Sequence, residues 1–139
     1  MLKQLVQENG SIEIPAKGNS MFPLIQEDDL CQFVECQPSL LKKGDIVLFY
    51  SLSGQLVGHR FCGTKCKNKA LYYTFKGDTN LGADDPVLDS AIVGKLVYIK
   101  KKKFTLHMDH FSSRLWGVVI QSFPFLSGLL RNYLNKQDR

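Results

Sequence analysis

The chain has 139 residues, which is enough for one domain with a buried core. Hydrophobic residues make up 44% and charged residues 22% of the sequence, a globular balance that excludes a disordered chain. The net charge of +5 is uneven, because residues 1–89 carry nine basic and eleven acidic residues, and residues 90–139 carry nine and two. A basic C-terminal part favours contact with an anionic surface, although a solvated lysine-rich strand end would give the same composition.

The sequence shows no targeting or membrane-spanning segment. Residues 1–10 contain charged residues and no apolar run, so they do not resemble a secretory signal peptide. No segment reaches the roughly eighteen consecutive apolar residues of a spanning helix. The cysteine spacings fit neither a disulfide-built scaffold nor a tight zinc site. We therefore expect free thiols, with a local disulfide or metal ligation as alternatives, at Cys31, Cys36, Cys62 and Cys66.

The first hundred residues have the patterns of a mainly β protein. Residues 45–50 (DIVLFY) form a continuous apolar run, which predicts a strand buried on both faces. Ser53–Gly54 predicts a hairpin turn directly after it. The other segments with strand patterns are residues 11–15, 30–35, 55–61 and 71–75.

Three further segments complete the first part of the chain. Residues 62–69 are polar and basic and are interpreted as an insertion. Residues 77–90 are rich in Asp, Gly and Pro, which predicts a loop. Residues 91–108 are expected to form one long strand, bent near the lysines at 100–103.

The pattern changes to helical after His110. Apolar residues recur at helical spacing, and Pro124 interrupts them, which predicts two short helices or one kinked helix over residues 111–135. The apolar face is wider than that of a typical surface helix, so it should contact the β body, a membrane interface or another protein. We therefore divide the chain into a β domain, residues 1–110, and an apolar amphipathic tail, residues 111–139.

Three short motifs contain residue types suited to nucleophilic catalysis. G-N-S-M-F-P (residues 18–23) places Ser20 on a tight turn, where backbone N–H groups can stabilise an oxyanion. G-H-R (residues 58–60) supplies His59, which can take the proton of a serine hydroxyl. K-G-D-T-N and the following D-D-P supply carboxylates that can orient an imidazole. Each motif alone is common in turns and strands that have no catalytic role.

The order of these motifs is more specific than any one of them. With K-G-D-I-V (residues 43–47) and I-V-G-K (residues 92–95) they resemble the type I signal peptidases. They look most like the endoplasmic-reticulum, archaeal and sporulating-bacterial branch, in which His replaces the Lys base. The resemblance extends from Gly18 to Lys95. It implies a small antiparallel coiled sheet or partly closed barrel of the signal-peptidase type, followed by a C-terminal helical segment.

The resemblance also implies roles for individual residues. Ser20 would be the nucleophile and His59 its general base, with Asp78 and one of two adjacent aspartates as acidic partners. Of these two, Asp85 is preferred because it directly precedes the Pro-Val pair, and Asp84 stays open. Asp45 and the glycines at 44 and 94 would be structural. The candidates for substrate binding are Met21, Phe22, Pro23 and Leu24.

The function that the resemblance implies is a serine endopeptidase that cleaves an extended leader or signal peptide after small residues. It needs no metal or other cofactor, and no nucleic-acid recognition motif accompanies the lysine run. Family members carry a spanning helix before the serine motif, whereas the nineteen residues ahead of Ser20 contain no long apolar run. We therefore expect either peripheral membrane or partner-protein contact through residues 111–135, or a cytoplasmic enzyme that trims a dedicated peptide.

Two other classes of protein remain as alternatives. The self-cleaving repressors share this type of fold, but they use a lysine base and carry a DNA-binding domain. A catalytically silent module of the same fold would bind a partner protein or a membrane through its C-terminal segment. A serine-reactive probe separates this module from an enzyme, because a silent site is not labelled.

Overall fold

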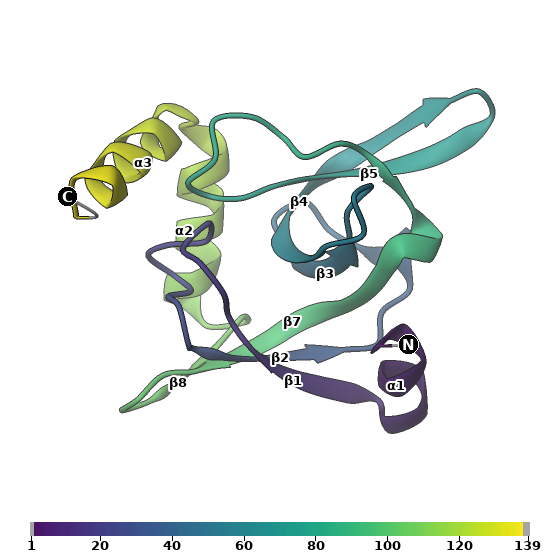
Figure 1. Cartoon of the computed structure of the whole chain (residues 1–139), viewed down its shortest axis with the longest axis horizontal. Coiled ribbons are helices and arrows are strands. Elements are labelled where there is room, and N and C mark those ends of the chain that lie inside the picture. The colour runs from purple at the N-terminus through teal and green to yellow at the C-terminus, as the bar shows by residue number, and fades with distance from the viewer. Residues whose placement is uncertain (1, 138–139) are drawn as a thin grey trace.

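The structure is a computed structural model that describes residues 2–137. It is dominated by one antiparallel sheet of eight strands (Figure 1), which confirms the mainly β class with C-terminal helices. The strand order is β1-β2-β7-β3-β4-β5-β6, with β8 paired to β7, and the end strands β1 and β6 do not pair with each other. The strands are β1 Ser11–Pro15, β2 Leu30–Val34, β3 Ile46–Tyr50, β4 Leu56–Lys67, β5 Ala70–Lys76, β6 Val87–Leu88, β7 Ile92–Lys100 and β8 Thr105–His107. The helices are α1 Leu2–Asn9, α2 Phe111–Ser122 and α3 Phe125–Gln137, with short 3-10 turns at Pro38–Leu40 and Asp89–Ala91.

Strand β3 is buried on both faces, as its apolar run predicted. Ile46 and Leu48 belong to an apolar cluster with α1, β2 and β7, whereas Val47 and Phe49 belong to a second cluster with β4, β5 and β6. The rings of Phe49 and Phe75 stack with their centroids 4.2 Å apart. Each fully buried side chain of this kind stabilises the fold by about 1.5–3 kcal/mol. Strand β3 is therefore a rigid support for its neighbour β4.

The predicted insertion at residues 62–69 is wrong. Strand β4 continues to Lys67, and β5 begins at Ala70, so the two strands form a long hairpin. Asn68 and Lys69 have φ values of +52° and +65°, the left-handed conformation that a tight two-residue hairpin turn requires at both positions. The far end of the hairpin is exposed on both faces, so no alternation of apolar and polar residues marked it as a strand.

The predicted long strand over residues 91–108 is also wrong, because it is a hairpin of β7 and β8. The chain turns after Lys100, where the Lys101 N–H donates to the Phe104 carbonyl at 2.8 Å. The Lys101 ammonium pairs with Asp29 and donates to the Leu24 carbonyl at 2.7 Å. Lys101 is thus a partly buried structural residue, and its contacts lie at the turn where β7 has ended. Helix α1, which lies ahead of β1, was not predicted.

The C-terminal helices pack on the sheet at one end of the molecule (Figure 1). They are two helices separated at Pro124, as expected. Ile120 and Leu134 are buried, and a Cβ at Gly117 would come within 2.8 Å of the Arg60 guanidinium. None of the described helices is long and apolar enough to cross a membrane. Met1, Asp138 and Arg139, which belong to the two predicted regions, lie outside the described residues.

Candidate active site

Three side chains from different parts of the chain form a continuous line of hydrogen bonds. Ser20 lies in the loop between β1 and β2 (residues 16–29, the serine loop), and His59 lies on β4. The Ser20 hydroxyl is 2.9 Å from His59 Nε2, and His59 Nδ1 is 2.5 Å from a carboxylate oxygen of Asp84. The imidazole is 7% exposed, and the edge of its ring packs against Phe49. When Nδ1 donates to Asp84, Nε2 is free to accept the proton of the serine hydroxyl.

The carboxylate beside His59 belongs to Asp84 and not to Asp85, the preferred candidate. Asp84 lies in the loop between β5 and β6 (residues 77–86, the acidic loop). Its backbone N–H donates to the Phe75 carbonyl at 2.8 Å, which fixes the loop to the end of β5. That bond aims the Asp84 side chain at the imidazole. The prediction failed because the position before Pro-Val carries no information about which side chain the loop turns inward.

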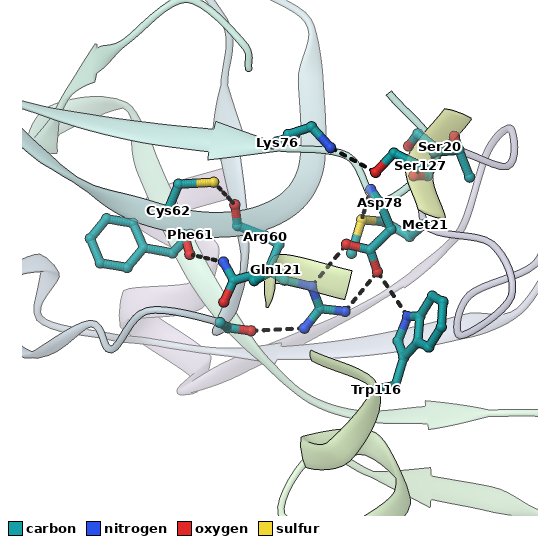
Figure 2. Close-up of polar contacts among 12 residues, drawn as sticks. Ser20, Met21, Arg60, Phe61, Cys62, Lys76, Asp78, Trp116, Gln121 and Ser127 are labelled. Carbon is teal, nitrogen blue, oxygen red and sulfur yellow. Dashed lines mark hydrogen bonds and ion pairs between the residues drawn. The ribbon is translucent and has the colours of Figure 1, made fainter. Parts of the chain in front are cut away.

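Asp78 does not contact His59, so its predicted role as a partner of the base is wrong. It accepts hydrogen bonds from Arg60 Nε at 2.8 Å and Nη2 at 2.7 Å, and from the Trp116 indole at 3.1 Å (Figure 2). Asp78 and Arg60 are 2% and 4% exposed. Since consecutive residues of a strand point to opposite faces, His59 and Arg60 cannot share one carboxylate. Asp78 instead joins β4 to helix α2.

The acidic loop holds the serine loop in place. Thr79 donates its backbone N–H to the Ser20 carbonyl at 3.0 Å, and its hydroxyl lies 3.3 Å from the same oxygen. The Asp78 N–H points at the sulfur of Met21 at 3.4 Å (Figure 2). A Cβ at Gly77 would come within 2.6 Å of the Asn80 amide and 3.1 Å of His59 Nε2, so a larger residue there would force these side chains to shift. The K-G-D-T-N motif therefore holds Ser20 in place through its backbone and through Thr79.

A cleft of about 690 Å³ opens beside Ser20 and His59. One wall is residues 14–18, at the end of β1 and the start of the serine loop, and the other is residues 55–58, at the start of β4. The interior is apolar and includes Cys31, whose thiol pKa is raised to about 11 by burial and, less strongly, by Asp29. This thiol stays protonated at neutral pH and acts as an apolar surface. The other apolar side chains in the interior are Met21, Ile25, Phe33 and Leu48.

Of the predicted substrate-binding residues, only Met21 lines this cleft. Phe22 stacks on Tyr133 of α3, with the ring centroids 5.7 Å apart. Pro23 and Leu24 lie at a separate hollow beside Trp116. The cleft walls at residues 14–18 and 55–58 were missed, because no signal in the sequence shows which strand edges face Ser20.

Two backbone donors beside the nucleophile remain free. The N–H groups of Ser20 and Met21 donate to no acceptor within residues 2–137. The Gly18 N–H points at the Glu27 carboxylate at 3.4 Å, and the Asn19 side chain accepts from the Glu27 N–H at 3.3 Å, which closes the serine loop on itself. Free N–H groups next to a nucleophile can stabilise an oxyanion.

The residues that were expected to be structural are so. Asp45 accepts a hydrogen bond from the Lys42 N–H at 2.8 Å, as predicted for a carboxylate that binds turn amides. Gly44 has a φ of +102°, which favours glycine. Gly94 lies within β7 and allows the backbone of β2 to come close. A Cβ at Gly94 would lie 2.7 Å from the Val34 carbonyl.

The site contains no group of metal ligands among the described residues. All four cysteines are unpaired. No family model, curated protein or solved structure matched the chain. The chemistry of the site therefore has to be argued from its own geometry.

Proposed function

We propose that the protein is a serine endopeptidase with Ser20 as nucleophile, His59 as general base and Asp84 as the group that orients the imidazole. The observation that carries this proposal is the unbroken line of hydrogen bonds through the three side chains, at 2.9 Å and 2.5 Å. A serine hydroxyl is a poor nucleophile until an adjacent base takes its proton. A carboxylate behind the base fixes its tautomer and stabilises the imidazolium that forms.

The reaction would be acyl transfer in two steps. The Ser20 oxygen attacks the carbonyl carbon of the scissile peptide bond, and its proton passes to His59 Nε2. The free N–H groups of Ser20 and Met21 would donate to the oxyanion that develops. His59 then gives the proton to the leaving amine, and an acyl-enzyme remains on Ser20. A water molecule, deprotonated by His59, releases the second product and restores the serine hydroxyl.

The cleft supports an extended peptide as substrate. Within the described residues, β1 pairs only with β2, and residues 56–59 of β4 pair only with β3, because β5 joins β4 from Arg60 onward. Both strands therefore have a free backbone edge that an added strand can bind by hydrogen bonds. The apolar interior of the cleft favours uncharged side chains. Together with the resemblance of the motifs, these features favour a leader or signal peptide cut after small residues.

A catalytically silent module that binds a partner protein or a membrane is the second candidate, and one observation favours it. Helices α2 and α3 keep a set of large apolar side chains exposed although both helices pack on the body. Phe111 and Phe125 are 76% and 65% exposed. The other exposed apolar side chains of these helices are Leu115, Val118, Leu129 and Tyr133, and Phe123 between the helices is exposed as well. Such a face is compatible with either function, so the activity of Ser20 decides between them.

Peptide cleavage by the purified chain tests the proposal. The substrates are extended peptides with alanine at the first and third positions before the cut, with and without anionic lipid vesicles. We expect cleavage by the parent and none by Ser20→Ala or His59→Ala, whereas Ser53→Ala, at an exposed turn, should cleave like the parent. A fluorophosphonate should label the parent at Ser20. If the parent neither cleaves nor is labelled, the peptidase proposal is overturned and the silent module becomes the better reading.

A further inference from the structure

We propose that Arg131 on helix α3 is a positioning residue for the nucleophile, and that it acts through Thr79. This inference rests on the proposed peptidase function. It makes the C-terminal helix a working part of the site, whereas the sequence suggested a separable tail. The argument starts from the contacts of the Arg131 guanidinium and follows them to Ser20 and His59.

The guanidinium of Arg131 donates three hydrogen bonds to the acidic loop. Its Nη2 donates to the Thr79 hydroxyl at 2.8 Å and to the Asn80 side-chain oxygen at 3.0 Å. Its Nε donates to the Thr79 carbonyl at 3.3 Å. The planar fork of arginine holds several acceptors at once in a fixed geometry, which lysine cannot do. Thr79 is fully buried, so these bonds are made away from competing water.

Arg131 is not held by opposite charge. Within residues 2–137, no carboxylate lies within salt-bridge distance of it, and its acceptors are neutral oxygens of the acidic loop. A surface arginine that only aids solubility has no reason to be ordered on a buried threonine. The contact pattern fits a residue whose role is to fix the shape of a loop.

The loop that Arg131 fixes is hydrogen-bonded to the backbone of Ser20. Thr79 donates its N–H to the Ser20 carbonyl at 3.0 Å, so Arg131 and Ser20 are separated by one residue. Asn80, which also accepts a hydrogen bond from Arg131, lies near the His59 imidazole. A Cβ built at Gly77 would be 2.6 Å from the Asn80 amide and 3.1 Å from His59 Nε2, which shows how closely the two groups surround that point.

Helix α3 contacts both active-site loops, but its other contacts have different targets. Tyr133 stacks on Phe22 in the serine loop, with 5.7 Å between the ring centroids. Ser127 accepts a hydrogen bond from the Lys76 ammonium at 2.8 Å, at the end of β5 (Figure 2). Ser127 thus ties the same helix to the body without touching Thr79 or Asn80. It provides a matched control for a role of Arg131 that goes beyond anchoring the helix.

The expected consequence is a loss of reaction rate with little loss of ligand affinity. Arg131 has no hydrogen bond to the cleft walls at residues 14–18 and 55–58, so binding in the cleft should be unchanged. A displacement of reacting groups by about 1 Å can cost on the order of 100-fold in rate. For a loop that keeps its bonds to Ser20 but loses its outer support, we expect about a tenfold loss.

The test compares Arg131→Ala, Arg131→Lys and Ser127→Ala with the parent. The readouts are the maximal rate and half-saturating concentration of fluorophosphonate labelling at Ser20, together with the melting temperature. For Arg131→Ala we expect the maximal rate to fall about tenfold and the half-saturating concentration to stay within about twofold. Arg131→Lys should recover part of the rate, because one ammonium can replace only part of the fork. Ser127→Ala should also lower the melting temperature, because the Lys76 ammonium loses its acceptor, but it should be labelled at the parent rate.

Amide hydrogen exchange gives a second readout that does not depend on activity. Arg131→Ala should accelerate exchange in peptides that cover residues 18–22 and 77–81, and Ser127→Ala should not. Parent labelling rates and unchanged exchange in folded Arg131→Ala would overturn the positioning role. Equal loss of rate in both variants would also overturn it, because anchoring of the helix would then explain the effect. A parent that is never labelled contradicts the proposed function instead, and the exchange data still decide whether Arg131 orders the loops.

Discussion

Two consecutive residues of β4, His59 and Arg60, are both paired with carboxylates, yet their surroundings differ. His59 meets Asp84, whose side chain is 24% exposed, at the edge of an open cleft. Arg60 meets Asp78 in a site where the two side chains are 4% and 2% exposed, and Trp116 and Gly44 complete the hydrogen bonds. The first pair leaves Nε2 directed at the Ser20 hydroxyl, whereas the second pair is enclosed by its own hydrogen bonds.

The difference teaches that a strand can serve two purposes with adjacent residues. One face of β4 presents His59 to Ser20 and the cleft, and the other face ties the sheet to helix α2. The short G-H-R motif therefore contains one residue of the candidate site and one structural residue. The following predictions are designed to separate the two roles.

The largest effect should come from Asp84→Asn. The amide cannot hold the imidazole in the tautomer that leaves Nε2 free to accept, so we expect kcat to fall by about 10⁴-fold. The melting temperature should change little, because the carboxylate is partly exposed. Peptide cleavage and thermal unfolding measure the two quantities.

Asp85→Asn is the matched control for that variant. The two residues are adjacent in one loop and differ in their contact with His59. Asp85→Asn should keep the kcat of the parent. A loss in Asp85→Asn as large as that in Asp84→Asn would contradict the assignment of the orienting carboxylate.

Asp78→Ala should chiefly affect stability. It leaves the Arg60 charge buried without a partner and removes the acceptor of the Trp116 indole. Removing one partner of a buried ion pair costs about 3–5 kcal/mol, so we expect the free energy of unfolding in urea to fall by that amount. The double variant Arg60→Met with Asp78→Leu should recover part of the loss, because no buried charge remains. An Asp78→Ala variant that is as stable as the parent would show that the network does not support the fold.

Gly77→Ala should lower stability less than Asp78→Ala does, and it should clearly slow labelling of Ser20. The new methyl group would meet the Asn80 amide and His59, and overpacking of this kind costs typically 1–3 kcal/mol. The shift of His59 should slow fluorophosphonate labelling of Ser20 at temperatures where the variant is still fully folded. Gly82→Ala, in the same loop but with nothing within 4 Å of the added Cβ, should behave like the parent. Equal behaviour of the two variants would argue against close packing around the imidazole.

Local sequence patterns were sufficient for the parts of the fold where one face or both faces of an element are buried. The run at residues 45–50 became β3, and the interruption at Pro124 separated α2 from α3. Sequence patterns gave wrong predictions where a segment is exposed on both faces, because no alternation of apolar and polar residues is then required. The exposed end of the β4–β5 hairpin was taken for an insertion, and the bend expected near residues 100–103 is a hairpin turn at which Lys101 contacts Asp29.

The candidate site divides in the same way. The order of the sequence motifs, and their resemblance to the type I signal peptidases, were sufficient to select Ser20 and His59 as the candidate pair. Only the tertiary structure decided that Asp84 contacts His59, that Asp78 binds Arg60, and that Arg131 reaches the acidic loop from α3. These choices depend on which way a loop turns and which strand face a residue occupies. Contacts with residues far apart in the chain decide the direction of a loop and the surroundings of a strand face, so a local sequence pattern cannot predict them.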